Sequence, residues 1–187
     1  MQQHFSNYTQ KLMHALSLCD IASVQSLAES LRDGWRRGQS VYLCGNGGSA
    51  GNAVHLANDF LYGAGVKEGG GLRVEALSAN VAVMTCLAND IGYDQVFAEQ
   101  IRVKARAGDI LIALSGSGNS PNIVNALEAG NALGMKTYAI LGYTGGRCKG
   151  LAQNPIHFAV DDMQIAEDLQ LIVGHICMQW LYQHGKS

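Results

Sequence analysis

Residues 110–121 read ILIALSGSGNSP, and this stretch decides the fold that the rest of the chain has to fit. Its five apolar residues predict a buried strand. The strand leads into a loop of three serines, two glycines and one asparagine. Ser120 then stands at the N-cap position of a helix, and Pro121 stands at the first helical position, where a missing N–H costs nothing. The stretch therefore predicts a strand, a Ser/Gly loop and a helix in succession.

The Ser/Gly loop has the composition of an anion-binding site. The free N–H groups and the dipole of the helix that follows favour an anion, and the glycines allow close backbone approach. The hydroxyls of Ser115, Ser117 and Ser120 offer further donors to a phosphate. Because the loop contains no Lys or Arg, it would bind phosphate mainly by hydrogen bonds. An ordinary capped turn explains the same residues without a ligand, but three serines within six residues favour phosphate.

Strands and helices alternate on both sides of this loop. We expect strands at residues 41–44, 73–77, 109–114, 136–141 and 155–160, and helices within 8–37 and at 49–61, 79–88, 94–105, 121–133 and 163–182. This alternation predicts an α/β fold, a three-layer α/β/α sandwich around a central parallel sheet. The length of 187 residues fits a single domain, with N-terminal helices in residues 1–38 and the α/β core in 39–187.

Composition excludes several classes of function. The net charge is −2, and Arg36-Arg37 is the longest basic run, so a nucleic-acid partner has little support. No apolar run approaches the roughly 20 residues of a membrane span, so no membrane partner is expected. The N-terminus lacks the pattern of a signal peptide, and five widely spaced cysteines are typical of a reducing compartment. We therefore expect a cytoplasmic protein.

A second glycine-rich loop, Gly45–Ser49, follows the expected strand at 41–44. Together with Ala50 it formally satisfies a dinucleotide-binding fingerprint. The next strand, however, is followed by Ser78 instead of the acid that would hold a ribose hydroxyl. We interpret the loop as a second backbone wall for a smaller ligand, because both loops lie beyond the carboxyl ends of parallel strands.

Two expected helices carry a set of imidazoles and carboxylates. His55 and Asp59 are four residues apart and share a helix face. Glu167 and His175 are eight apart, which leaves them within roughly 80° of each other around a helix. The set suits zinc or another divalent cation, and it equally suits an acid and a base that move protons between sugar carbons. Solvated acids and packed histidines would give the same spacing.

Four motifs together resemble the sugar isomerase (SIS) domain family, in particular its phosphoheptose isomerase branch. They are Gly45-Asn46-Gly47-Gly48-Ser49, Asn89-Asp90-x-Gly92, Ser115-Gly116-Ser117-Gly118-Asn119-Ser120 and Gly174-His175. The similarity covers nearly the whole chain. It implies a flavodoxin-like, SIS-type fold and an aldose–ketose isomerase that converts sedoheptulose 7-phosphate to D-glycero-D-manno-heptose 7-phosphate. It also implies a homotetramer with active sites between subunits, to which the N-terminal helices would contribute.

The resemblance assigns roles to individual residues. It implies substrate contacts from Asn46, Gly47, Gly48, Ser49, Asn89, Asp90, Ser115, Gly116, Ser117 and Ser120. It implies a zinc site at His55, Asp59, Glu167 and His175, with Asp59 and His175 also the acid–base pair and Glu167 the alternative base.

The chain departs from the family pattern at five positions. The family usually has Glu at Asp59, Gln at Glu167 and Thr at Gly116, and it has arginines where this chain has Gly63-Ala64 and Ile165. The loss of two cations bears on which sugar phosphate is the substrate.

Two rival functions are a non-catalytic SIS protein, like the relatives that bind the bacterial replication initiator, and a phosphosugar-sensing module that regulates a partner. The presence of both Asp59 and His175 favours an enzyme over the first.

Overall fold

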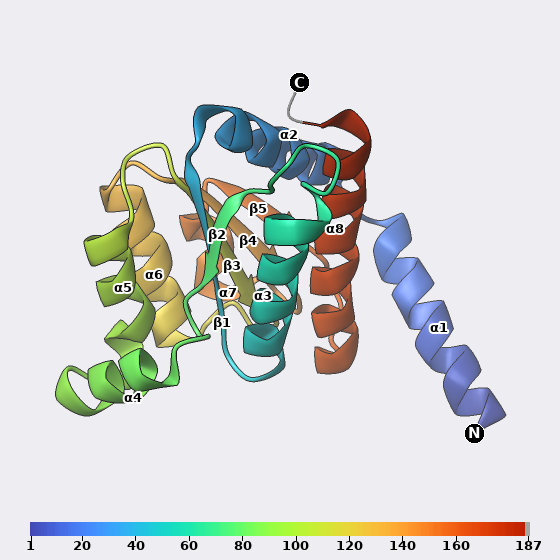
Figure 1. Cartoon of the computed structure of the whole chain (residues 1–187). Helices are drawn as coiled ribbons and strands as arrows, with labels where there is room; N and C mark the ends of the chain where they lie inside the picture. The colour runs from blue at the N-terminus through green and yellow to red at the C-terminus, as the bar shows by residue number, and fades with distance from the viewer. Residues whose placement is uncertain (186–187) are drawn as a thin grey trace.

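The computed structural model describes residues 1–185, which form one parallel sheet with helices on both faces (Figure 1). The strand order is β2-β1-β3-β4-β5. The strands are β1 (Ser40–Gly45), β2 (Arg73–Ala76), β3 (Ile110–Ser115), β4 (Lys136–Leu141) and β5 (Asn154–His157). Every neighbouring pair is parallel, which confirms the predicted sheet.

The central strand β3 shows why the fold has three layers, with the sheet between two layers of helices. Its side chains alternate between two apolar clusters, with Ile110, Ile112 and Leu114 in one and Leu111 and Ala113 in the other. Helices α2 (Ile21–Arg37), α3 (Gly48–Asn58) and α8 (Met163–His184) cover the first face, and α5 (Val96–Lys104), α6 (Pro121–Ala132) and α7 (Gly146–Leu151) cover the second (Figure 1). Because both faces are covered, the strand is apolar from Ile110 to Leu114. The predicted sandwich is confirmed.

Some local predictions differ from the structure. The short helix α7 lies in a stretch for which no helix was predicted, and β5 ends at His157, before the expected boundary. The helix expected at 49–61 changes at its end into the π-helical turn η1 (Asp59–Gly63). A π-helical turn inserts one residue into the helical register and is frequent at functional sites. Spacing in the sequence cannot reveal it, because a π-helical turn follows neither the period of an α-helix nor that of a β-strand.

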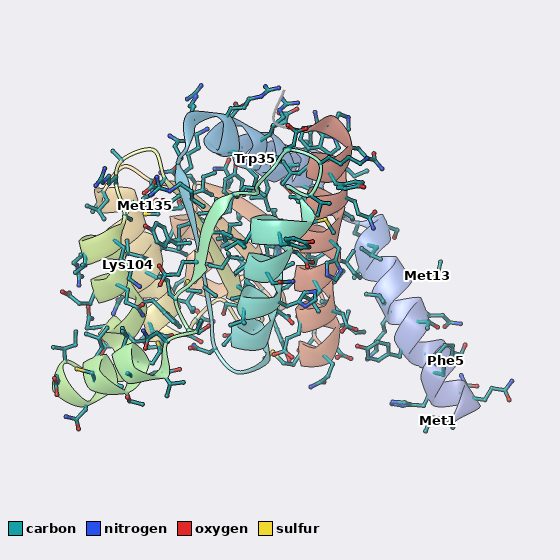
Figure 2. All side chains as sticks on the ribbon, viewed as in Figure 1. Met1, Phe5, Met13, Trp35, Lys104 and Met135 are labelled. Atoms are coloured by element: carbon teal, nitrogen blue, oxygen red, sulfur yellow. The ribbon has the colours of Figure 1, made fainter. Side chains whose placement is uncertain are left out.

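Two helices stand outside the sandwich. Helix α1 (Gln2–Ser17) projects from the body and buries only Ala15 among its residues (Figure 1). Met1, Phe5 and Met13 lie along it, away from the sheet (Figure 2), and Phe5 is 69% exposed. Helix α4 (Val81–Asp90) is apolar in sequence and yet contains no buried residue. Both helices therefore present apolar side chains to solvent in a single chain.

In residues 1–185, no helix is both long enough and apolar enough to span a membrane.

Helix α1 is fixed to α8 by two polar contacts. The Tyr8 hydroxyl donates to the Asp168 carboxylate at 2.5 Å, and Lys11 pairs with Asp162 at 3.2 Å. The hydrogen bond to Asp168 raises the pKa of Tyr8 to about 12, because ionisation would remove the proton that the bond requires.

Candidate active site

The two Gly/Ser loops form the walls of one pocket. Strands β1 and β3 are neighbours in the sheet, and their ends pair at Gly45 and Leu114, so the loops leave the sheet side by side. The pocket between them has a volume of about 270 Å³. It is lined by Asn46, Gly47, Gly48, Ser49, Leu114, Ser115, Gly116, Ser117, Ser120, Met163 and Glu167. All of the substrate-binding residues expected from the sequence are therefore here, except Asn89 and Asp90.

The hydroxyls of the β3–α6 loop have different partners. Ser115 is buried, and its Oγ accepts from the Gly118 N–H at 3.0 Å. The Ser117 Oγ accepts from the Asn119 N–H at 3.3 Å. Ser120 is the N-cap residue as predicted, but its side chain makes no capping hydrogen bond. The hydroxyl protons of Ser117 and Ser120 are thus available at the N-terminus of α6, where a phosphate would also meet the positive end of the helix dipole.

The opposite wall is fixed by side-chain amides, of which Asn46 was predicted from the sequence and Asn122, Gln170 and Asn52 were not. Asn46 and Asn122 exchange two hydrogen bonds of 2.8 Å, each amide donating to the other. The Gln170 amide donates to the Ser49 Oγ at 3.0 Å and accepts from Asn52 at 3.0 Å. Asn122 and Gln170 are both buried polar residues in apolar helices, and this pattern is the signal that could have found them.

Glu167 lies in this pocket and not with the histidines. A Cβ atom on Gly48 would stand 2.3 Å from the Glu167 Oε2, so only glycine leaves room for the carboxylate. Gly48 is the first residue of α3, and the N-terminus of this helix favours a negative charge. The four-residue metal set expected from the resemblance is therefore divided: the structure keeps three members together and places Glu167 beside the phosphate loop. The eight-residue spacing along α8 separates it from His175 by about 12 Å of helical rise.

His55, Asp59 and His175 converge at one point between α3 and α8. The Asp59 Oδ2 lies 3.4 Å from the His55 Nε2 and 3.3 Å from the His175 Nε2. The helices approach closely because Leu56 packs over Gly174, where a Cβ would stand 2.2 Å from the Leu56 Cδ2. Asp59 is the first residue of the π-helical turn, which helps to set the direction of its carboxylate. The structure thus brings His175 of α8 together with His55 of α3 and Asp59 of η1, a contact that spacing in the sequence could not show.

This group can hold a metal ion. One ligand atom from each of the three residues lies within 4.8 Å of the others. Two imidazole nitrogens and one carboxylate oxygen match the ligand preference of zinc, and three protein ligands leave a coordination position for substrate. The residues therefore fit a divalent cation on geometry and on donor type.

Asn89 and Asp90 are not in the pocket. They lie at the exposed end of α4 and bond to each other, with Asn89 Nδ2 donating to the Asp90 Oδ1 at 2.8 Å. This bond, and a second from the Cys86 thiol, lower the pKa of Asp90 because they stabilise the ionised carboxylate. The Tyr93 hydroxyl from the next turn reaches the Asn46 Oδ1 at 3.0 Å, so this segment is connected to the pocket at one point.

Comparison with known proteins places the chain in a family. Residues 4–142 match the family model described as the SIS domain. The chain is 40% identical over 170 residues to a phosphoheptose isomerase of Pelodictyon phaeoclathratiforme, covering 90% of this chain and 73% of the relative. It is 36% identical over 162 residues to that of Helicobacter pylori strain P12, covering 87% and 82%.

Solved structures give the same result. A phosphoheptose isomerase from Francisella tularensis superposes with a TM-score of 0.90 at 25% identity, and the match covers 97% of this chain and 96% of the other. The fold and the sequence identity agree. The chain belongs to the SIS domain family, and within it to the phosphoheptose isomerase branch.

Proposed function

We propose that the chain is an aldose–ketose isomerase that interconverts sedoheptulose 7-phosphate and D-glycero-D-manno-heptose 7-phosphate. The observation that carries the proposal is the combination, along the same two helices α3 and α8, of a serine-lined pocket and the His55–Asp59–His175 group. The identity of 40% to a phosphoheptose isomerase supports the choice of substrate. A non-catalytic SIS protein would need the pocket but not the three-residue group.

The phosphate would bind at the N-terminus of α6. Ser117 and Ser120 direct hydroxyls to the pocket, and the free N–H groups of the first turn of α6 add donors to a phosphate dianion. No Lys or Arg side chain lines the pocket among the described residues. Binding would therefore depend on hydrogen bonds and the helix dipole, as the loop composition predicted.

The distance between the two ends of the site fits a long substrate. Both ends lie along the contact between α3 and α8, where Asn52 bonds to Gln170 near the pocket and His55 meets His175 at the other end. Seven residues of α3 separate Gly48 from His55, which corresponds to roughly 10 Å of helical rise. An extended chain of seven sugar carbons and a terminal phosphate spans roughly 10 Å, at about 1.2 Å per bond. A seven-carbon sugar phosphate is therefore long enough to reach along α3 from the pocket to the histidines.

The chemistry needs one base and one proton relay. A base removes a proton from the carbon beside the carbonyl, and the resulting cis-enediol receives the proton back on the neighbouring carbon. A second group moves a proton between the two oxygens, so the reaction needs no external oxidant or reductant. We assign the carbon proton to Asp59 and the oxygen proton to His175, with Glu167 as the alternative base. The position of Glu167 beside the phosphate loop is the reason for ranking Asp59 first.

We further propose zinc at His55, Asp59 and His175. When bound, zinc would polarise the substrate carbonyl and stabilise negative charge on the enediol oxygens. His55 would serve only as a ligand, since Asp59 and His175 already supply the acid and the base. Glu167 is left out of this set unless its side chain turns away from Gly48.

A panel of ketose phosphates tests the function. The native protein should convert a seven-carbon ketose 7-phosphate to its aldose far faster than it converts five- and six-carbon homologues, with products identified by NMR and mass spectrometry. Tight binding of all three phosphates without any turnover would contradict the isomerase and favour a phosphosugar sensor. Equal turnover of all three sugar phosphates would contradict the argument from substrate length and leave the isomerase activity standing.

We also propose a cytoplasmic homotetramer with active sites between subunits. The exposed apolar side chains of α1 and α4 support association with other copies of the chain. All five cysteines are free, which supports a reducing compartment.

A further inference from the structure

We propose that Asn122 is a positioning residue for phosphate binding, and that it acts through Asn46 by holding the two walls of the pocket at a fixed separation. The inference depends on the proposed function in one respect, that the pocket binds a phosphate. It assigns a role to a residue that lines neither the pocket nor the His55–Asp59–His175 group.

The contact between Asn46 and Asn122 is a closed pair of amides. Asn46 Nδ2 donates to the Asn122 Oδ1 at 2.8 Å, and Asn122 Nδ2 donates to the Asn46 Oδ1 at 2.8 Å. Asn122 is 2% exposed, so its own amide would be left without a partner if the pair were broken. A paired amide of this kind fixes both distance and orientation, because both bonds must be linear at once.

The pocket needs such a connection at this place. The backbone ladder joins β1 to β3 as far as Gly45 and Leu114, and beyond that point the two loops have no ladder between them. Asn46 is the first residue of one wall, and Asn122 is the second residue of α6, two residues after Ser120 of the other wall. The amide pair therefore sets where the N-terminus of α6 lies relative to residues 46–49.

The pair also explains what the Asn46 side chain can still do. Its Oδ1 accepts a second bond from the Tyr93 hydroxyl at 3.0 Å, and its Nδ2 already donates to Asn122. Only one N–H of Asn46 remains for a ligand. The residue that the family resemblance marks as a substrate contact is thus mainly a connector among the β1–α3 loop, α6 and the segment at Tyr93.

The experiment compares three variants of α6 in the full chain. Asn122→Ala removes both bonds, and Asn122→Asp keeps the volume but faces the Asn46 Oδ1 with a second acceptor. Asn125→Ala is the matched control, since Asn125 lies one turn further along α6 and bonds to the Asp94 carbonyl at 2.9 Å without touching Asn46. Calorimetry with inorganic phosphate measures the pocket independently of turnover, and steady-state kinetics with sedoheptulose 7-phosphate separates KM from kcat.

We expect both Asn122 variants to lose about tenfold or more in phosphate affinity and to raise KM by a similar factor, with kcat changed by less than about threefold. Asn125→Ala should retain wild-type phosphate affinity. Tyr93→Phe, which removes one bond to Asn46 and keeps the amide pair, should show a smaller loss of about two- to threefold.

Three results would overturn the inference. One is wild-type phosphate affinity in folded Asn122→Asp, whatever happens to the alanine variant. Another is an equal loss in Asn125→Ala, which would mean that any weakening of α6 has the same effect. A fall in kcat with unchanged KM would place Asn122 in the chemistry instead. Failure of the proposed function looks different: the wild-type protein would bind inorganic phosphate but not convert the heptulose phosphate, and the binding comparison would still decide the role of Asn122.

Discussion

The Nε2 atoms of His55 and His175 lie 2.9 Å apart, although 120 residues separate them in the chain. Two ring nitrogens at this distance repel each other if both carry a proton, so they require a shared proton or a cation between them. The Asp59 carboxylate contacts both rings from the same side. The arrangement therefore favours positive charge at its centre, and a metal ion satisfies it with all three ligands.

Removal of either imidazole should release the metal. In His55→Ala and His175→Ala we expect zinc content, measured by elemental analysis of protein purified without an affinity tag, to fall to a small fraction of the wild-type value. His157→Ala is the control, because its ring bonds to the Tyr143 carbonyl elsewhere in the structure. A native protein without metal, whose turnover survives chelation, would refute the zinc site and leave Asp59 and His175 as acid and base.

Neutralising Glu167 should strengthen phosphate binding. Its carboxylate lies in the pocket, with no ion pair to a described cation, and it repels a phosphate dianion. We expect Glu167→Gln to tighten the binding of inorganic phosphate by roughly fivefold, corresponding to about 1 kcal/mol of repulsion between partly solvated charges. Glu29→Gln on α2 changes the net charge equally and should have no effect. If instead kcat collapses in Glu167→Gln at full metal content, Glu167 is the base and the assignment to Asp59 is wrong.

Loss of the loop hydroxyls should weaken binding without unfolding the protein. Each donor to an anion contributes about 1.5–3 kcal/mol, so Ser117→Ala with Ser120→Ala should reduce phosphate affinity by well over tenfold. The free energy of unfolding should change by less than about 1 kcal/mol, since the Ser120 side chain makes no capping bond. Calorimetry and denaturant unfolding measure the two effects separately. Unchanged affinity would show that the phosphate lies elsewhere.

Charge on the apolar side of α1 should break the assembly. Phe5 and Met13 are 69% and 71% exposed in the single chain and would be buried in a tetramer that uses this helix. We expect Phe5→Asp with Met13→Asp to shift the mass in light scattering from tetramer to a smaller species. Asn7→Asp, at an exposed position about 160° from Phe5 and 120° from Met13 around the same helix, should keep the wild-type mass. A wild-type protein that is monomeric at micromolar concentration would contradict the proposal directly.

The cysteines should differ sharply in reactivity. Burial raises the pKa of Cys177 to about 12 and that of Cys148 to about 11, whereas Cys86, whose pKa is raised by its hydrogen bond to Asp90, is exposed on α4. At about pH 8 a thiol reagent should label Cys86 and leave the buried thiols intact. The pKa values of these two buried thiols are raised in the folded protein. Their contribution to the free energy of unfolding is therefore complete below about pH 9 and is lost as the pH rises towards 11 to 12. Fast labelling of Cys177 in the native protein would contradict the packing of α8.

The sequence alone was sufficient for the order of strands and helices. Apolar strands such as 110–114 and the Ser-Pro start of α6 are local signals, because burial and helix capping act over a few residues. The same kind of signal marked Gly45–Ser49 and Ser115–Ser120 as neighbouring loops, since parallel strands end at one edge. It did not reveal α7 or the π-helical turn at Asp59, where packing overrides local preference.

Contacts between distant segments needed the tertiary structure. Spacing along α8 put Glu167 and His175 on related faces, but only the packing of α3 against α8 decided that His175 joins His55 and Asp59 while Glu167 lies over Gly48. The Asn46–Asn122 pair is of the same kind, because its two amides are 76 residues apart and no local pattern indicates that they meet. The sequence by itself determined which elements form and where a phosphate could bind. The tertiary structure decided which side chains share a site, because helix packing distances depend on contacts such as Leu56 over Gly174 that no local pattern encodes.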